Sequence, residues 1–182
     1  MMSLLATLSR KIDAVNDVVG RAVSWLAIVM VLVQFAVVLM RYIFGLGSIM
    51  MQESVVYMYA VIFMAGAGYT LLRDGHVRID IFYRGANQRR KALVNLGGVV
   101  IFLIPVSLLI WIKSFPYVAS SWRVLEGSKE TSGIPAVFVL KSFILVFAAL
   151  MLLQGVSLAI RSLLILGGRA ESEASSGERE DL

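Results

Sequence analysis

Four long stretches without a charged residue constrain this chain more than any other feature of its sequence. They cover residues 22–40, 54–72, 92–112 and 142–160. An α-helix rises about 1.5 Å per residue, so roughly 19 residues or more can cross the roughly 30 Å hydrocarbon core of a bilayer. The apolar residues form blocks, whereas in one soluble core they would recur between polar ones. We predict an all-α integral membrane protein with four transmembrane helices.

The residues that flank the uncharged stretches set the ends of the spans. We place one four-helix transmembrane domain at residues 22–166, with spans at about 22–44, 53–72, 92–113 and 136–163. Pro105 lies inside the third span, where a membrane helix tolerates proline as a kink. Pro135 precedes the fourth span and suits the first turn of a helix.

The segments on either side of this domain have different patterns. Residues 1–21 are predicted to form an amphipathic interfacial helix, because apolar residues recur at spacings of three and four. These residues are Leu5, Leu8, Ile12, Val15 and Val19. Residues 167–182 contain five acids, two arginines and no apolar cluster. We expect this acidic tail to be disordered and cytoplasmic.

The distribution of lysine and arginine orients the spans. Four spans put both termini on one side of the membrane, and cytoplasmic loops carry an excess of these residues. With the termini inside, twelve lysines and arginines lie inside and five outside. We therefore predict a multi-pass membrane protein with both termini cytoplasmic. The net charge of +5 reflects this asymmetry and does not indicate nucleic-acid binding.

Ionisable residues flank the connection between the first two spans. Arg41 and Tyr42 end the first span, and Glu53 begins the second. A tight hairpin would bring Arg41 and Glu53 to one outer interface, where an ionisable residue at membrane depth suggests an ion or proton pathway. Alternatively, the two residues pair or reach to the interface and fix the depth of the hairpin. Neither lies in the middle of the membrane, which favours the structural interpretation.

The most distinctive stretch is LLRDGHVRIDIFYRG at residues 71–85. A turn at Asp74 and Gly75 is predicted after the second span. If the stretch beyond it is helical, His76 and Asp80 face each other at a spacing of four. A metal site is disfavoured with a single histidine and no cysteine. Contact with anionic lipid and docking to another membrane subunit remain the two interpretations.

Small residues lie on two of the spans. Gly66 and Gly68 are on the second span, and Gly97 and Gly98 are on the third. Small residues let the backbones of membrane helices approach closely. We expect these glycines to mark helix-packing faces.

The amino-acid composition excludes several classes of catalytic and metal-binding site. The chain has no cysteine and one histidine, so it cannot form a thiolate-held cluster, a zinc ribbon or bis-histidine haem ligation. It has no phosphate-binding loop, no serine–histidine pair within a span and no cluster of carboxylates. We predict that the chain is not an enzyme and binds no cofactor or metal.

Several of these segments together resemble the small membrane subunit of tripartite ATP-independent periplasmic (TRAP) transporters, the DctQ-type family. The matching pieces are RYIFG at 41–45, QES at 52–54, MAGAGYTLLRDGHVRIDIFY at 64–83 and SGIP at 132–135. They lie on a four-span layout that covers roughly residues 10–166. Family members often carry an aromatic residue and a second acid near the glutamate, whereas Met50, Met51 and Ser54 surround Glu53.

The resemblance implies a function shared with partners. A soluble periplasmic binding protein would capture the solute, and a large polytopic membrane subunit would bind sodium ions and move the solute. The small subunit would be a non-catalytic scaffold for the large subunit, and both would lie in membrane lipid. The HVRID sequence within the motif is similar to that of the family branch associated with organic acids. The resemblance assigns hairpin or subunit-interface roles to Arg41, Tyr42, Glu53, Gly66, Gly68, Arg73, His76 and Asp80.

Two other interpretations use the same residues. A stand-alone ion or proton channel would depend on Arg41 and Glu53. A membrane anchor for another complex would need only the four spans.

Overall fold

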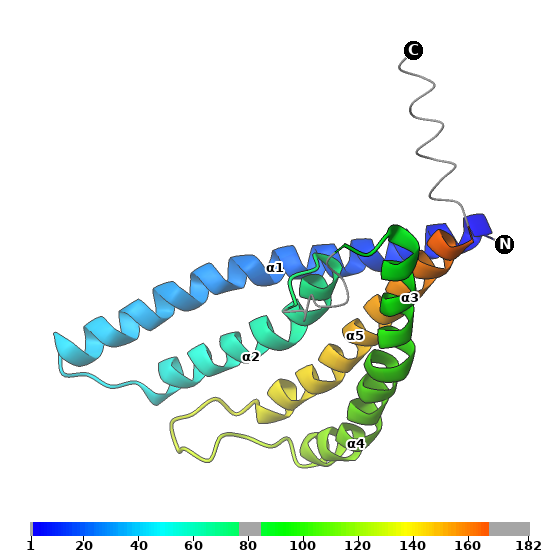
Figure 1. The fold of residues 1–182 in the computed structure, drawn as a ribbon. Coiled ribbons are helices and arrows are strands. Elements are labelled where there is room, and N and C mark those ends of the chain that lie inside the picture. The colour runs from blue at the N-terminus through cyan, green and yellow to red at the C-terminus, as the bar shows by residue number, and fades with distance from the viewer. Residues whose placement is uncertain (1, 77–84, 168–182) are drawn as a thin grey trace.

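The computed structural model describes residues 2–76 and 85–167, and all of the regular elements in these two ranges are helical (Figure 1). The elements are α1 (Met2–Tyr42), α2 (Ile49–Leu72), α3 (Gln88–Gly98), the π-helical segment η2 (Val99–Leu103), α4 (Ile104–Arg123) and α5 (Val137–Leu166). Because α3, η2 and α4 follow one another without a break, the chain forms four helical rods.

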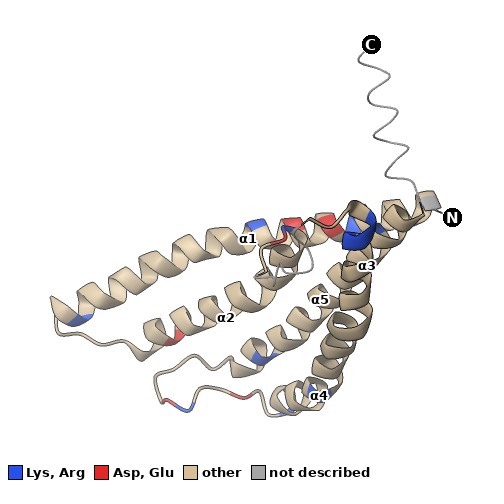
Figure 2. Ribbon diagram, viewed as in Figure 1, with Lys and Arg blue, Asp and Glu red and all other residues tan. Residues whose placement is uncertain are grey.

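Each rod contains a helix long and apolar enough to cross a membrane. The shortest, α2, has 24 residues, which corresponds to about 36 Å at the rise of an α-helix. The predicted all-α architecture with four membrane-spanning helices is therefore confirmed. Figure 2 shows charged residues near the start of α2, on α3 and around the α4–α5 loop, whereas several on α1 lie partway along the rod.

The first rod is longer than its span requires. We expected a separate amphipathic helix at residues 1–21, but α1 runs without interruption from Met2 to Tyr42. No proline occurs in this stretch, and its single glycine, Gly20, packs against the ring of Tyr69. The interfacial position of the first turns stays a prediction.

Helix α5 is the centre of the fold. It packs against α1, α2, α3, η2 and α4, and it contains more buried residues than any other helix of the fold. Figure 1 shows the rods fanning out from the end where α1 begins and α5 finishes, so that the α1–α2 hairpin and the α4–α5 loop lie at the splayed end. The large apolar residues left exposed on the rods suit a lipid environment.

The third rod curves between α3 and α4 in Figure 1, and Pro105 is the second residue of α4. Proline has no backbone N–H, so it cannot donate to the carbonyl of Ile101 in the preceding turn. Just before it, the N–H of Ile104 donates to the carbonyl of Val99, five residues back, which is a π-helical hydrogen bond. The kink expected at Pro105 thus coincides with a π-turn.

The fourth rod begins slightly later than predicted. Its N-cap is Ala136 and its first helical residue is Val137, so Pro135 precedes the helix instead of forming its first turn. The carbonyl of Pro135's neighbour Ile134 still accepts the N–H of Ala136, at 2.8 Å. The helix starts one residue after the predicted start of the span at 136, which leaves the predicted span intact.

Candidate functional site

Glu53 ties the start of α2 to the α4–α5 loop, residues 124–136. One carboxylate oxygen accepts the hydroxyl of Ser128, and the other accepts the backbone N–H of Ile134 at 2.6 Å. We call Glu53, Ser128 and Ile134 the loop clasp. A Cβ on Gly133 would lie 2.7 Å from the same carboxylate, so glycine is needed for this close approach. The SGIP segment therefore closes around Glu53.

Arg41 and Tyr42 are not part of the loop clasp. Both are exposed at the end of α1, and no ion pair joins Arg41 to Glu53, although the structure describes both residues. Glu53 faces the α4–α5 loop instead. The two residues that the sequence placed at one hairpin are thus not paired, and the glutamate bonds to a loop that lies far along the chain.

A second polar group fixes the same loop. Glu126 accepts hydrogen bonds from the ammonium of Lys141 at 2.5 Å and from the hydroxyl of Ser121 at 2.7 Å. The hydrogen bond from Lys141, followed by that from Ser121, lowers the pKa of the Glu126 carboxyl. Lys141 also lies 4.1 Å from the centre of the Tyr117 ring. Neither Lys141 nor Glu126 is among the site residues that the sequence predicted.

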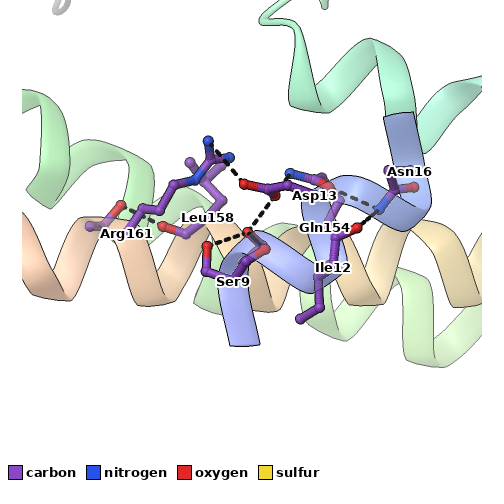
Figure 3. A network of polar contacts seen from close by, with 9 residues as sticks. Ser9, Ile12, Asp13, Asn16, Gln154, Leu158 and Arg161 are labelled. Atoms are coloured by element: carbon purple, nitrogen blue, oxygen red, sulfur yellow. Dashed lines mark hydrogen bonds and ion pairs between the residues drawn. The ribbon is translucent and has the colours of Figure 1, made fainter. Parts of the chain in front are cut away.

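The opposite end of the fold holds a larger polar cluster between α1 and α5 (Figure 3). We call it the α1–α5 network, and its members are Ser9, Asp13, Asn16, Gln154, Ser157 and Arg161. Asp13 accepts hydrogen bonds from Gln154 at 3.0 Å and from Ser157 at 2.6 Å. Arg161 approaches the same carboxylate at 3.6 Å. Because Ser157 donates its proton to Asp13, Ser9 donates to Ser157, at 2.7 Å.

The carboxylate of Asp13 determines which groups of Gln154 and Asn16 donate hydrogen bonds and which accept them. An ionised carboxylate only accepts, so Gln154 must turn its NH₂ group toward Asp13 and its carbonyl oxygen toward Asn16. The NH₂ group of Asn16 then donates to that oxygen at 2.8 Å. The carbonyl oxygen of Asn16 is buried without a hydrogen-bond partner and occupies the space where a Cβ on Gly68 would be. Three helices, α1, α5 and α2, therefore meet at this point.

The four glycines that we expected at helix-packing faces differ in how closely other residues approach them. Gly68 is buried and approaches both Asn16 and Leu150, so it is a close-packing position. At Gly66, an added Cβ would meet only Val23, at 3.8 Å. At Gly97 and Gly98, an added Cβ would meet nothing within 4 Å. The glycine pair of the third rod is therefore not explained by packing within the described chain.

The turn after α2 is bound to α1. Arg73 donates to Asp17 at 2.6 Å, and Asp17 also pairs with Arg21. The hydrogen bond to Asp17 is the main reason why the pKa of the Arg73 guanidinium is raised. His76 is exposed at the bend that follows. Asp80 lies outside the described residues, so the expected His76–Asp80 relation is not tested.

The chemistry that these groups can perform is limited. Among residues 2–76 and 85–167, no group of three or more histidine, cysteine, aspartate or glutamate side chains could hold a metal ion. The polar side chains of the loop clasp and of the α1–α5 network join one helix or loop to another. Both are thus arranged to hold the rods in register.

Comparison with known proteins agrees with the architecture. The family model described as "Tripartite ATP-independent periplasmic transporters, DctQ component" matches residues 30–164, which is 135 of the 182 residues. The chain belongs to the DctQ family. The resemblance to the small membrane subunit of TRAP transporters is thereby confirmed. The matched range includes Glu53 and the loop clasp, whereas the α1 side of the α1–α5 network precedes it.

A curated relative supports the same family. The C4-dicarboxylate TRAP transporter small permease protein DctQ of Vibrio cholerae is 33% identical over 109 residues, which are 58% of this chain and 45% of that protein. The chain thus matches less than half the length of this relative. No solved structure matches the chain. Four apolar helices and membership of the DctQ family indicate a multi-pass protein of the inner membrane.

Proposed function

We propose that this chain is the non-catalytic small permease subunit of a TRAP-type, sodium-gradient-driven importer of organic acids or related small solutes. In this role it packs along the large polytopic membrane subunit and scaffolds it, while a periplasmic binding protein delivers the solute. Membership of the DctQ family and the name of the Vibrio cholerae relative support this assignment. That name also fits organic acids as the solute class.

One observation carries the scaffolding role. Glu53 was the best candidate for an ion-coupling residue, yet both of its carboxylate oxygens accept hydrogen bonds from the α4–α5 loop. A carboxylate that binds a transported cation needs oxygens that can face that ion. The arrangement at Glu53 instead suits a joint between two parts of the fold.

Co-purification tests the proposal. The tagged chain, solubilised from native membranes, should bring down a large polytopic membrane protein in stoichiometric amount. Uptake of organic acids by the complex in liposomes should require a sodium gradient and the binding protein. A solitary, monodisperse chain that transports ions in liposomes would overturn the proposal in favour of a channel.

Variants of Glu53 separate the scaffold from the channel. Glu53→Gln keeps one carbonyl acceptor for the loop, so uptake should fall only partly, with a lower yield of complex. Glu53→Ala removes the loop clasp, and its loss of yield should be larger. A channel that uses the Glu53 charge would instead lose flux completely in Glu53→Gln at normal yield.

The orientation of the termini and the interfacial position of the first turns of α1 are part of the proposal. The chain has no native cysteine, so single cysteines report sidedness without background. Ser3→Cys should react with a membrane-impermeant maleimide only from the cytoplasmic side, and Ser132→Cys only from the outside. Labelling of both from one side would exclude this orientation.

A further inference from the structure

The start of α3 carries three consecutive basic residues, Arg89, Arg90 and Lys91. At this end of the fold, Asp13 pairs with Arg161, and Asp17 pairs with Arg21 and Arg73. Arg89 and Arg90 are exposed, and neither forms an ion pair with an acid in residues 2–76 or 85–167. Figure 2 shows this positive charge gathered on α3, beside the end of α5.

The position of the two arginines relative to the rest of the rod is fixed. Asn87 caps the helix by accepting the N–H of Arg90 at 3.0 Å, and Arg89 donates to the carbonyl of Leu166 at 3.4 Å. The uncharged span begins at Ala92, directly after the basic residues. The arginines therefore lie where the third rod enters the membrane, at the level of lipid headgroups.

An apolar surface continues from Arg90 along the same face of the helix. Leu93, Val94 and Gly97 follow Arg90 at spacings of three, four and seven, which places them on one face. Leu93 and Val94 are more than 45% exposed, at 57% and 49%. Ala92, on another face, is buried. The exposed face of α3 is thus cationic at its start and apolar below.

We propose that this face binds an anionic phospholipid, with the phosphate at Arg89 and Arg90 and an acyl chain along Leu93 and Val94. The guanidinium fork matches the oxygens of a phosphate, and clustered basic residues next to a membrane helix attract anionic headgroups. The cationic start of α3 complements an anionic headgroup, and the apolar face that follows complements an acyl chain. This inference goes beyond the transport role and rests only on the membrane crossing of the third rod.

The test titrates the purified full-length chain with phosphatidylglycerol or with phosphatidylcholine of the same acyl chains, and counts bound lipid by native mass spectrometry. Phosphatidylglycerol should bind more tightly to the wild type. Arg90→Gln should weaken its binding about fivefold, and the pair Arg89→Gln/Arg90→Gln about 25-fold. The pair Arg89→Lys/Arg90→Lys should retain most of the affinity, because it keeps the charge.

The matched control removes the same charge at the other end of the fold. Arg123→Gln/Lys129→Gln should change phosphatidylglycerol binding less than twofold, since both residues are exposed near the α4–α5 loop. Equal weakening by this control pair would overturn the proposal. Equal affinity of the wild type for the two lipids would also overturn it. So would full displacement of the lipid by equimolar glycerol 1-phosphate, which would indicate a site for a free anion. Circular dichroism verifies that each variant keeps its helix content.

Discussion

Replacement of Gln154 by leucine should destabilise the fold by about 2–3 kcal/mol. Gln154 is fully buried and joins Asp13 to Asn16 by bonds of 3.0 and 2.8 Å. Loss of the bond to Asp13 costs about 0.6 kcal/mol, the average for side-chain hydrogen bonds between membrane helices. Loss of the other bond leaves the buried NH₂ group of Asn16 with only the carbonyl of Ile12 at 3.4 Å. A buried donor left without a good partner costs about 1–3 kcal/mol.

The assay is reversible unfolding by dodecyl sulfate in mixed micelles, followed by the fluorescence of the three tryptophans. A double-mutant cycle isolates the contact, since Asn16→Leu/Gln154→Leu removes both amides and leaves no unpaired donor. The double variant should be more stable than the sum of the two single losses predicts, by about 1–2 kcal/mol. Val156→Leu is the control, because Val156 is exposed on the same helix. It should change the free energy of unfolding by less than about 0.5 kcal/mol.

Two results would refute this reasoning. If the single losses simply add in the double variant, Asn16 and Gln154 are not coupled. If Gln154→Leu is as stable as the wild type, the polar contacts do not hold α1 against α5. Gln154→Glu sharpens the test. It removes the donor to Asp13 and places a second carboxylate beside it, so it should destabilise the fold more than leucine does at neutral pH.

Three further predictions concern other contacts. Gly68→Ala should lower the free energy of unfolding by about 1–3 kcal/mol, because its Cβ would overlap Asn16 and press on Leu150. In the same assay, the control Gly97→Ala should be neutral or stabilising by up to about 1 kcal/mol. Gly133→Ala should open the loop clasp, detected as faster proteolysis of residues 124–136 with unchanged helix content, and equal proteolysis would contradict the geometry at Glu53. The pKa of Glu126 is lowered in the fold, so its contribution to stability should be complete above its ordinary carboxyl value of 4.5 and be lost as pH falls through the lowered value. Glu126→Gln should remove this part of the acid dependence, and an unchanged pH profile of unfolding would count against the Lys141 contact.

The four spans could be predicted from the sequence because a bilayer demands long uncharged segments, whatever the helices later pack against. The exact starts of the rods could not. Apolar residues at spacings of three and four, with charges such as Arg10, Lys11 and Arg21 between them, suggested a separate helix before the first span. Charged residues do not break a helix, however, and nothing in the backbone of α1 interrupts its hydrogen bonds. The composition of the segment changes near residue 21, and its secondary structure does not.

Glu53 was predictable as a candidate residue, whereas its partners were not. Glu53 stood out because it is an acid at the start of a span. Its partners are 75 and 81 residues away, at Ser128 and Ile134. Only the tertiary arrangement, in which α2 packs against α5, brings the α4–α5 loop to it. Arg41, two residues before the turn that follows α1, was the nearer candidate in sequence and makes no such pair.

In the first turns of α1, the face that packs against α5 is mainly polar. Of the predicted apolar positions, only Ile12 is buried, whereas Leu8 and Val15 are exposed. The face that meets α5 is centred instead on Ser9 and Asn16, which are buried and polar. Lipid tails are as apolar as leucine, so burial of leucine between membrane helices gains little.

Hydrogen bonds and small residues then decide which faces meet. Helix α5 obeys the same rule, since its buried residues include Gln154, Gly155, Ser157 and Ser162. The sequence marks the α1–α5 contact by polar residues at helical spacing, namely Ser9 and Asn16 in residues 1–21 and Gln154 and Ser157 in the fourth span. By the same reasoning, the exposed apolar side of α1 needs no partner within this chain, because lipid covers it without cost.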